Sequence, residues 1–514
     1  MVVSMATSHL FIIEIIAVSY YCIGAFSNAG LRGLCPLEDD AQEQYLCVGC
    51  APGVKLDARR SWLPAVAQLL WRGMSVCEAD HPWFKRRFYA HFDRPMRCNA
   101  AVALATTPAR VSTHAFLPFL SFDLGSRRYD RKKRKVTQKV RRVSVAAHAD
   151  AHIFSYYSWQ LREKLERALD KCSISESVLA YRRMNPRKSN IEFADEAFRF
   201  ILSFGSCEAV GLDIEGFFDG IPHEILKRQW AELLGEKLLP EDHYSVFRAV
   251  TKWSSVDRDK AFSALGISKR HAGRMRRAIC TPREFRETIR GSNLIDVNRG
   301  TKGIPQGSPV SAVLSNIVMI ELDRRMSRCA AKHGALYRRY SDDILLVGCA
   351  DAVGGLEELL RLELERMKLN IQDEKTVRCS FQRDVVSGVL RSSRPLQYLG
   401  FIFDGERILI RPQTLSKFQQ RMKAGVRSAR RAARRAENKG GRRQLFRRDL
   451  FTRFSHLGPA GMRFDRTSHT PRRSNFWRYV VRASRNMRRS EIRRQMRRHW
   501  PRLNAEIRGA DETD

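Results

Sequence analysis

The sequence lacks an apolar segment long enough to cross a lipid bilayer. A membrane-spanning helix needs roughly 20 consecutive apolar residues. The most apolar stretch, His9 to Phe26, is interrupted by Glu14, and no basic residue precedes it as in a signal peptide. We therefore expect no stable membrane insertion.

Paired cysteines are also scarce. The chain has 12 cysteines, and most of them stand alone in the sequence. The one local cluster, Cys47 and Cys50 with Cys35, Cys77 and His81 nearby, has no second CxxC or HxxxH pair to complete a zinc site. This spacing favours free thiols in a reducing compartment over a disulfide framework, so we expect a cytoplasmic protein.

Acidic residues are few relative to basic ones. There are 55 Asp and Glu against 92 Lys and Arg, which gives a net charge of +37. Residues 411–514 alone hold 30 basic and 8 acidic residues, a net +22. Such an excess indicates a polyanionic partner, either nucleic acid or an anionic membrane face. A merely solvated basic surface fits this one-sided distribution poorly.

The length and the apolar content indicate a folded protein of several domains. A chain of 514 residues suggests about three domains. Hydrophobic residues make up 43% of it, which is enough for a substantial core. Residues 1–80 differ in composition from the rest, and we interpret them as an N-terminal extension of uncertain order.

The central motif is Tyr340-Ser341-Asp342-Asp343, which precedes the apolar run 344–347. That run predicts a buried strand with the aspartates at the turn entering it. Adjacent carboxylates resist joint ionisation, and a divalent cation with oxygen ligands would relieve the repulsion. Taken alone, the motif is equally compatible with a solvated turn, since Asp is common in turns.

Four further stretches reduce the weight of that alternative. Asp213 follows an apolar strand start and precedes Phe217, Phe218 and Asp219. A loop rich in Gly and Pro, 303–309, precedes a long apolar run. Lys375 closes a polar segment, and Leu399-Gly400-Phe401 follows it.

In this order the stretches resemble the palm motifs of reverse transcriptases. The segments 147–153 and 239–244 are similar to the bacterial "unknown group", which includes enzymes that defend cells against phage and is related to group II intron and retron enzymes. The resemblance implies an α/β (α+β) right-hand polymerase fold. Fingers would span 81–205, the palm 206–410 with a fingers insertion at about 230–300, and a helical basic thumb with a C-terminal extension 411–514.

The same resemblance implies two-metal phosphoryl transfer with Mg²⁺ or Mn²⁺. Asp213 and Asp342 would bridge both ions, Asp343 would be a supporting ligand, and the backbone carbonyl of Ile214 would add a further one. Lys375 would protonate the leaving pyrophosphate or contact a phosphate.

The family's nucleotide site implies further roles. Phe218 would reject ribonucleotides by closing against the sugar 2′ position, although a core Phe is the alternative. Gln306 would pack against the incoming nucleotide. Arg182 would help to cradle template and nucleotide, unless it is a surface Arg. Arg141 would have a similar nucleotide-binding role in the fingers. Arg142 stands where the family usually has Pro, so the assignment between Arg141 and Arg142 stays open.

Two further groups would contact nucleic acid. Leu399, Gly400 and Phe401 would form the turn that grips the primer end. Basic residues of the predicted thumb would bind duplex or structured RNA, namely Arg430, Arg431, Arg434 and Arg435. The implied partners are an RNA template, a DNA primer or product and dNTPs, with a dedicated noncoding RNA as a further candidate.

The predicted function is therefore RNA-directed DNA synthesis in bacterial antiphage defence. Three alternatives stay open: an RNA-directed RNA polymerase, a group II intron-type maturase, and a nucleic-acid-binding protein with an inactive palm. Retention of Asp213, Asp342 and Asp343 argues against the last of these.

Overall fold

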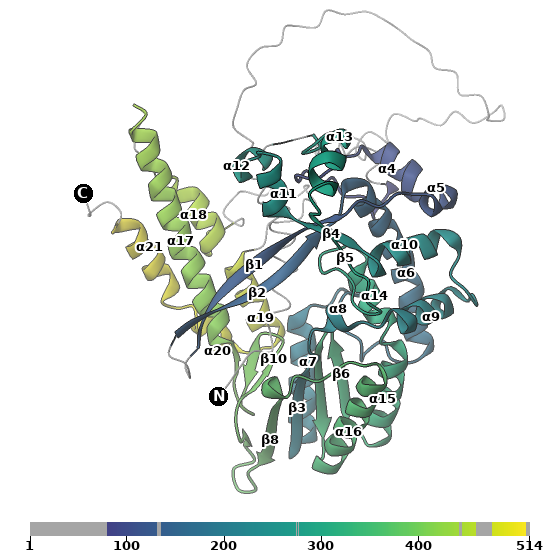
Figure 1. Ribbon diagram of the computed structural model, residues 1–514. Coiled ribbons are helices and arrows are strands. Elements are labelled where there is room, and N and C mark those ends of the chain that lie inside the picture. The colour runs from purple at the N-terminus through teal and green to yellow at the C-terminus, as the bar shows by residue number, and fades with distance from the viewer. Residues whose placement is uncertain are drawn as a thin grey trace, which may run out of the picture. The chain divides into compact units, whose positions relative to one another are not determined.

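The computed structural model describes residues 80–130, 135–273, 275, 277–440, 445–458 and 475–509 (Figure 1). The predicted extension 1–80 and its cysteine cluster lie outside this part, apart from Asp80; His81 lies within it. The chain divides into two compact units. Of the described residues, one unit contains those of Tyr157–Trp253 and from Asn298 onward, and the other contains those of 80–156 and Ser254–Val297. Within the described part, no helix is both long and apolar enough to span a membrane.

A five-stranded antiparallel sheet is the centre of the first unit. Its strand order is β6-β7-β3-β8-β9. The strands are β3 (Cys207–Asp213), β6 (Leu336–Tyr340), β7 (Asp343–Gly348), β8 (Val377–Arg383) and β9 (Leu390–Ser392). Every residue of β7 is buried, as the apolar run after the aspartates predicts. A strand buried on both faces needs helices or a second sheet on each side.

Helices cover both faces of this sheet. On one face, α15 (Ile320–Lys332) contacts β6, and α16 (Ala350–Arg366) contacts β3 and β7. On the other face, α7 (Asn190–Phe204) packs into a core that also includes a second sheet. The strands of that sheet are β10 (Leu396–Tyr398), β11 (Phe401–Phe403) and β12 (Ile408–Ile410). Figure 1 shows α15 and α16 on the side of the large sheet opposite β10.

Apolar periodicity predicted several helices correctly. The patterns over 150–169, 223–234 and 241–253 correspond to α6 (His148–Lys171), α9 (His223–Leu234) and α10 (Glu241–Thr251). Shorter elements connect them to the Gly/Pro loop and to the sheet. These are α8 (Phe217–Gly220), α14 (Ser311–Ile317) and the 3₁₀ turn η2 (Asp373–Lys375).

The basic C-terminal part of the first unit is helical, as the abundance of Ala and Arg predicts. Its longest helix, α17 (Pro412–Glu437), buries Phe418, Met422 and Val426 on one side and exposes a basic side. The ring of Phe418 lies 4.5 Å from that of Phe476, centroid to centroid. The shorter helices are α18 (Arg447–Phe454), α19 (Phe476–Asn486), α20 (Ser490–Arg494) and α21 (His499–Arg508).

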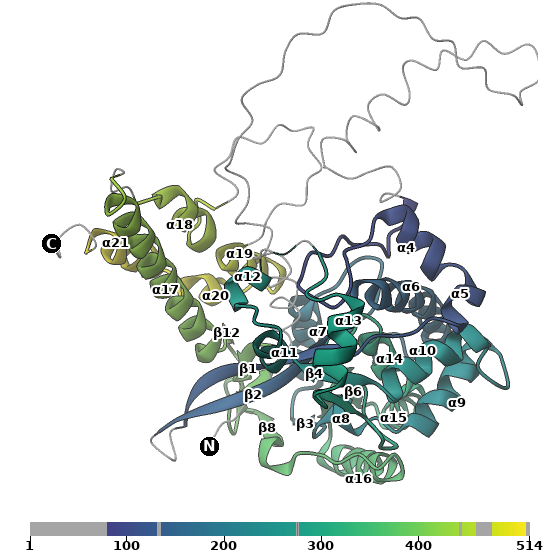
Figure 2. The same cartoon turned by 45° about the horizontal axis from the view of Figure 1, so that its top comes forward.

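The second unit is built on a four-stranded sheet with the order β2-β1-β4-β5. Its long hairpin pairs β1 (Phe119–Asp130) with β2 (Lys135–Val145), and β1 runs parallel to β4 (Ser254–Asp257). Figure 2 shows this hairpin as the longest ribbon of strands in the molecule. The remaining elements are β5 (Ile295–Val297), α4 (Cys98–Ala105), α5 (Pro108–Ser112), α11 (Arg258–Ala264), α12 (Lys269–Ala272), α13 (Pro282–Glu284) and the π-helix η1 (Phe285–Arg290).

Candidate active site

The three predicted catalytic aspartates meet at one end of the large sheet. Asp213 ends β3 and Asp343 begins β7, and the two are direct partners in the antiparallel register. The amide of Ile214 donates a 3.0 Å hydrogen bond to the carbonyl of Asp342. Asp213 and Asp342, which are 129 positions apart in the sequence, are brought together because β3 pairs with β7.

A two-residue turn presents Asp342. Tyr340 and Asp343 are paired across the hairpin of β6 and β7, so Ser341 and Asp342 form its loop. Ser341 has φ 62°, whereas Asp342 has no positive φ. A positive φ at only the first loop residue is typical of a type II′ turn, where Gly is favoured. A serine in this conformation needs support from its surroundings.

That support comes from a buried arginine one residue before the motif. Arg339 and Asp323 both have 0% exposure. The guanidinium of Arg339 donates to both carboxylate oxygens of Asp323, at 2.7 and 2.6 Å, and to the carbonyl of Ser341 at 3.1 Å. Burial favours a lower pKa for Arg339, but Asp323 raises that pKa above its ordinary value. The guanidinium therefore stays charged and fixes the turn.

The network extends to two neighbouring segments. Asn316 of α14 accepts from Arg339 at 3.2 Å and donates to the carbonyl of Ala180 at 2.8 Å. The hydroxyl of Tyr337 donates to Asp323 at 2.7 Å. Sequence reasoning missed Arg339, Asp323 and Asn316, because nothing in the pattern distinguishes a buried ion pair from the exposed charges typical of these residue types.

The electrostatics of the site disfavour three ionised carboxylates. Burial, followed by the charges of Asp342 and Asp213, raises the pKa of Asp343 well above its usual range. Lys375, on η2, donates to Asp213 Oδ1 at 2.7 Å and so places a positive charge beside the Asp213 carboxylate. Lys375 thus lies within reach of the site in which its role was predicted.

The donor set fits a divalent cation. Carboxylate oxygens are hard ligands of the kind that such ions prefer, and a cation would relieve the repulsion that raises the pKa of Asp343. Among the described residues, no three or more His, Cys, Asp or Glu side chains are close enough together to hold a metal ion as they stand. Asp213 forms its ion pair with Lys375 instead, so we expect that pair to rearrange when a cation binds.

The segment after Asp213 is fixed against the Gly/Pro loop. Phe217 is buried, whereas Phe218 is partly exposed. The carbonyl of Phe218 accepts from the amide of Ile304 at 2.9 Å. Gly303 has φ 92°, and a Cβ there would meet the carbonyl oxygen of Asp219 at 3.0 Å, so the close approach requires glycine. This hydrogen bond keeps the backbone of Phe218 next to the loop that carries Gln306.

The loop that carries Gln306 is held by a hydrogen bond from the start of α14. The hydroxyl of Ser311 donates to the carbonyl of Pro305 at 2.6 Å, and Gly307 has φ 111°. Gln306 is partly exposed. The predicted nucleotide contact of Gln306 remains a prediction.

The predicted arginines of the nucleotide site have identifiable surroundings. The guanidinium of Arg182 is paired with Glu166 at 2.6 Å and also donates to backbone carbonyls. Arg141 is half-buried on β2 of the second unit. The alternative residue, Arg142, is exposed and lines a cavity of about 210 Å³ together with Lys260 and Asp257. The choice between Arg141 and Arg142 stays open.

The predicted duplex-binding arginines of α17 differ in exposure. Arg431, Arg434 and Arg435 are exposed. Arg430 is half-buried, and its guanidinium donates to the carbonyl of Glu506 in α21. Arg430 therefore contributes to helix packing, whereas the other three residues are exposed.

Comparisons with known proteins agree with this geometry. Residues 155–403 match the family model described as "Reverse transcriptase (RNA-dependent DNA polymerase)". Two Myxococcus xanthus proteins match over short segments. Retron Mx162 reverse transcriptase is 40% identical over 51 residues, and Retron Mx65 reverse transcriptase is 39% identical over 69 residues. These segments cover 10% and 13% of this chain, and 10% and 16% of the relatives' own lengths.

Solved structures with weak overall similarity include two structures of telomerase from Candida tropicalis. The apo telomerase truncated from its C-terminal domain has a TM-score of 0.36 and 11% identity, covering 62% of this chain and 61% of that one. The apo telomerase has a TM-score of 0.34 and 13% identity, covering 77% and 64%.

Residues 155–403 thus form a reverse transcriptase domain. The predicted mixed α/β fold class and the predicted relationship to retron enzymes are confirmed. Polymerases of this family generally use divalent metal ions, in line with the donor set at the end of the sheet.

The raised pKa of Asp343 leads to a prediction about stability. A folded-state pKa above the unfolded value means that the free energy of unfolding falls as the pH rises above about 4. In EDTA, Asp343→Asn is therefore expected to melt at a higher temperature than the wild type at pH 8, with the difference shrinking towards pH 4.5. Saturating Mg²⁺ should also shrink it, because the cation stabilises the ionised carboxylates.

Circular dichroism melting curves at several pH values measure this difference. Asp351→Asn, at an exposed position on α16, is the matched control and should show no such pH dependence. A wild-type protein that is as stable as Asp343→Asn at pH 8 in EDTA would contradict the prediction.

Proposed function

We propose that the protein is an RNA-directed DNA polymerase that adds dNTPs to a primer by two-metal phosphoryl transfer. The observation that carries this proposal is the meeting of Asp213, Asp342 and Asp343 at paired strand ends, with Lys375 beside them. The match of residues 155–403 to the reverse transcriptase family supports it.

In the proposed mechanism the protein positions the reactants and stabilises charge. Asp213, Asp342, Asp343 and the carbonyl of Ile214 would hold Mg²⁺ or Mn²⁺. When bound, such ions would supply positive charge that stabilises the charge developing during phosphoryl transfer. Lys375 has its ammonium group at the site, where it would hold a proton for the leaving pyrophosphate.

The proposed partners are an RNA template, a DNA primer or product and dNTPs. The net charge of +37 and the exposed arginines of α17 support a nucleic-acid partner. The two Myxococcus relatives are named as retron reverse transcriptases. A dedicated noncoding RNA as a further partner, a cytoplasmic location and a role in antiphage defence are part of the proposal; the defence role is motivated by the resemblance of segments 147–153 and 239–244 to defence-associated enzymes. Fingers at 81–205, a palm at 206–410 and a thumb with its extension at 411–514 remain the proposed domains.

Three rival functions make different predictions. An RNA-directed RNA polymerase would prefer rNTPs, against the proposed role of Phe218. A nucleic-acid-binding protein with an inactive palm would incorporate no nucleotide. A group II intron-type maturase and reverse transcriptase would be encoded within an intron, so the sequence that flanks its gene would identify it. Salt-dependent binding would occur in each case, so nucleotide incorporation is the discriminating measurement.

The first prediction of this proposal concerns Asp342. Asp342→Asn should reduce dNTP incorporation on an RNA template by several orders of magnitude, because the variant loses a charged metal ligand at the point of reaction. A primer-extension assay with Mg²⁺ measures the loss. Asp351→Asn, exposed on α16, should retain wild-type activity. Incorporation by Asp342→Asn at the wild-type rate would show that the site is wrong.

The second prediction concerns sugar discrimination. Phe218→Ala should relax selection against rNTPs, because removal of the partly exposed ring opens space at the proposed 2′ position. The ratio of kcat/KM for dNTP and rNTP measures this effect. Phe217→Leu, at the buried neighbouring position, should change stability but not the ratio. A wild-type enzyme that already prefers rNTPs would overturn the assignment.

The third prediction concerns the exposed arginines of α17. Gln at positions 431, 434 and 435 should weaken template binding and lower processivity, while single-nucleotide chemistry stays nearly intact. Each lost phosphate contact should flatten the salt dependence of binding by a slope of roughly 0.7–0.9. Arg430 is left unchanged because it packs against α21.

Fluorescence binding titrations at several salt concentrations measure that slope. A matched triple variant neutralises three exposed arginines on other helices, namely Arg228, Arg328 and Arg366. It has the same net charge as the α17 variant. Equal slopes for the two variants would show that α17 contacts no phosphates in particular.

A further inference from the structure

The turn between β10 and β11 has an unusual backbone. Tyr398 and Phe401 are paired across the hairpin, and Leu399 and Gly400 form its loop with φ of 45° and 91°. Positive φ at both loop residues is typical of a type I′ turn, which favours Asn or Gly at the first position. A leucine there is strained, and its side chain is buried. The turn therefore depends on external contacts.

One side chain supplies the contact to the turn's backbone. Asn190, the first residue of α7, donates through Nδ2 to the carbonyl of Leu399 at 2.9 Å. The same amide nitrogen donates to the hydroxyl of Tyr479 in α19, also at 2.9 Å. The ring of Tyr479 stacks on that of Phe401, with centroids 6.2 Å apart. The turn is thus held from α7 and from α19 together.

Helix α19 is docked on the first turn of α7 by three side chains. Besides Tyr479, Arg482 donates to the hydroxyl of Ser189 at 2.9 Å, and Asn486 donates to Glu192 at 2.7 Å. Ser189 and Glu192 form the capping box of α7. The three α19 residues are spaced three and four apart, so they lie on one helix face.

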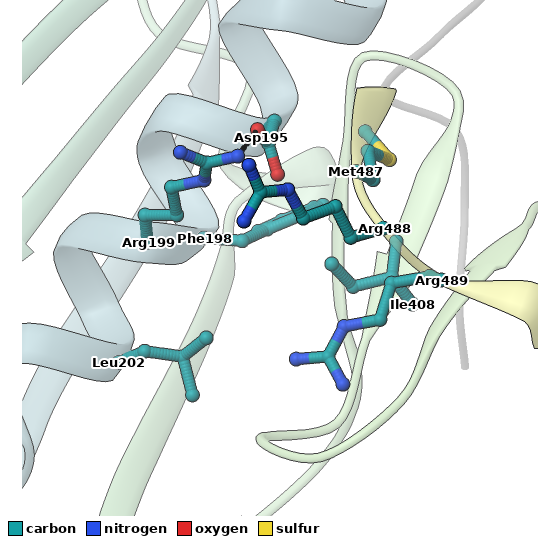
Figure 3. A pocket seen from close by; sticks show the side chains of 8 residues that line it. All are labelled: Asp195, Phe198, Arg199, Leu202, Ile408, Met487, Arg488 and Arg489. Atoms are coloured by element: carbon teal, nitrogen blue, oxygen red, sulfur yellow. Dashed lines mark ion pairs between the residues drawn. The ribbon is translucent and has the colours of Figure 1, made fainter. Parts of the chain in front are cut away.

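The rest of α7 is not in such close contact with the chain that follows α19. A cavity of about 250 Å³ lies between the later turns of α7 and residues 487–489. Figure 3 shows Asp195 and Arg199 of α7 on one side of it, facing Arg488 and Arg489 on the other. The polar contacts of Tyr479, Arg482 and Asn486 all fall on the first turn of α7, beside the Leu399–Gly400 turn.

We propose that Asn190 and Tyr479 are positioning residues for the primer end. They hold the carbonyl of Leu399 and the ring of Phe401, and so make the C-terminal helix α19 a structural part of the primer-gripping turn. This inference rests on the proposed polymerase function. It accounts for an otherwise strained leucine, and it links Tyr479, which lies 80 positions after Leu399 in the sequence, to the reaction geometry.

Steady-state primer extension tests the proposal. Asn190→Asp removes the donor and places a carboxylate against the Leu399 carbonyl, and Tyr479→Phe removes only the hydroxyl. Asn190→Asp should lower kcat for primer extension by roughly tenfold to a hundredfold, the order expected for a reactant displaced by ~1 Å. Tyr479→Phe should have a smaller effect. The KM for dNTP should stay within about twofold for both, since neither residue contacts the nucleotide.

Non-additivity and a matched control sharpen the test. Because both residues act on the same turn, adding Tyr479→Phe to Asn190→Asp should cost little more than Asn190→Asp alone. Tyr244→Phe, on α10 away from this turn, should extend primers normally. An Asn190→Asp variant with wild-type kcat, or a loss of kcat matched by Tyr244→Phe, would overturn the proposal.

Hydrogen exchange separates this inference from the proposed function. In Asn190→Asp, amides of residues 399–401 should exchange at least about tenfold faster than in the wild type, whether or not the protein polymerises. If the wild-type protein incorporates no nucleotide, the polymerase proposal is refuted, and with it the role of these residues at a primer end. Unchanged exchange at 399–401 in an active enzyme would refute the positioning role alone.

Discussion

The buried ion pair between Arg339 and Asp323 is the interaction on which the candidate active site depends. Two charges taken fully out of water are costly unless their hydrogen bonds are satisfied, so such a pair adds little net stability. Here Tyr337, Asn316 and the Ser341 carbonyl complete the network. Its consequence is specificity: the guanidinium fixes the turn that presents Asp342 and places Asp343 opposite Asp213. The strained serine is thereby held by the core.

The three carboxylates of the site repel one another, whereas the polar groups around Arg339 and Asp323 have their hydrogen bonds satisfied. Asp343 is buried near two other carboxylates, and its pKa is raised as a result. Lys375 pairs with Asp213 and supplies one positive charge. A surplus of negative charge at a strand end is unfavourable for an apoprotein but suits a divalent cation. Helices α15 and α16 pack on one side of the sheet and stabilise the strands that carry these carboxylates.

The sequence predicted the large sheet's buried strand, the aspartates at its entrance and the principal helices, because these rest on local patterns. Apolar runs identify β7, and periodicity identifies α9. Arg339 and Asp323 could not be identified in this way, since charged residues are ordinarily exposed and their pairing joins two elements. Asn190 and Tyr479 are 289 positions apart, and only the tertiary structure brings them together. The packing of Arg430 on α21 was missed for the same reason.

The most direct measurement is the rate of single-nucleotide incorporation by Arg339→Lys. Lysine keeps the charge that Asp323 requires, but its single ammonium group cannot reproduce the planar fork that also reaches Asn316 and the Ser341 carbonyl. The account predicts a folded protein whose incorporation rate falls by about a hundredfold, as the turn carrying Asp342 loses its anchor. A folded Arg339→Lys enzyme with the wild-type rate would contradict it.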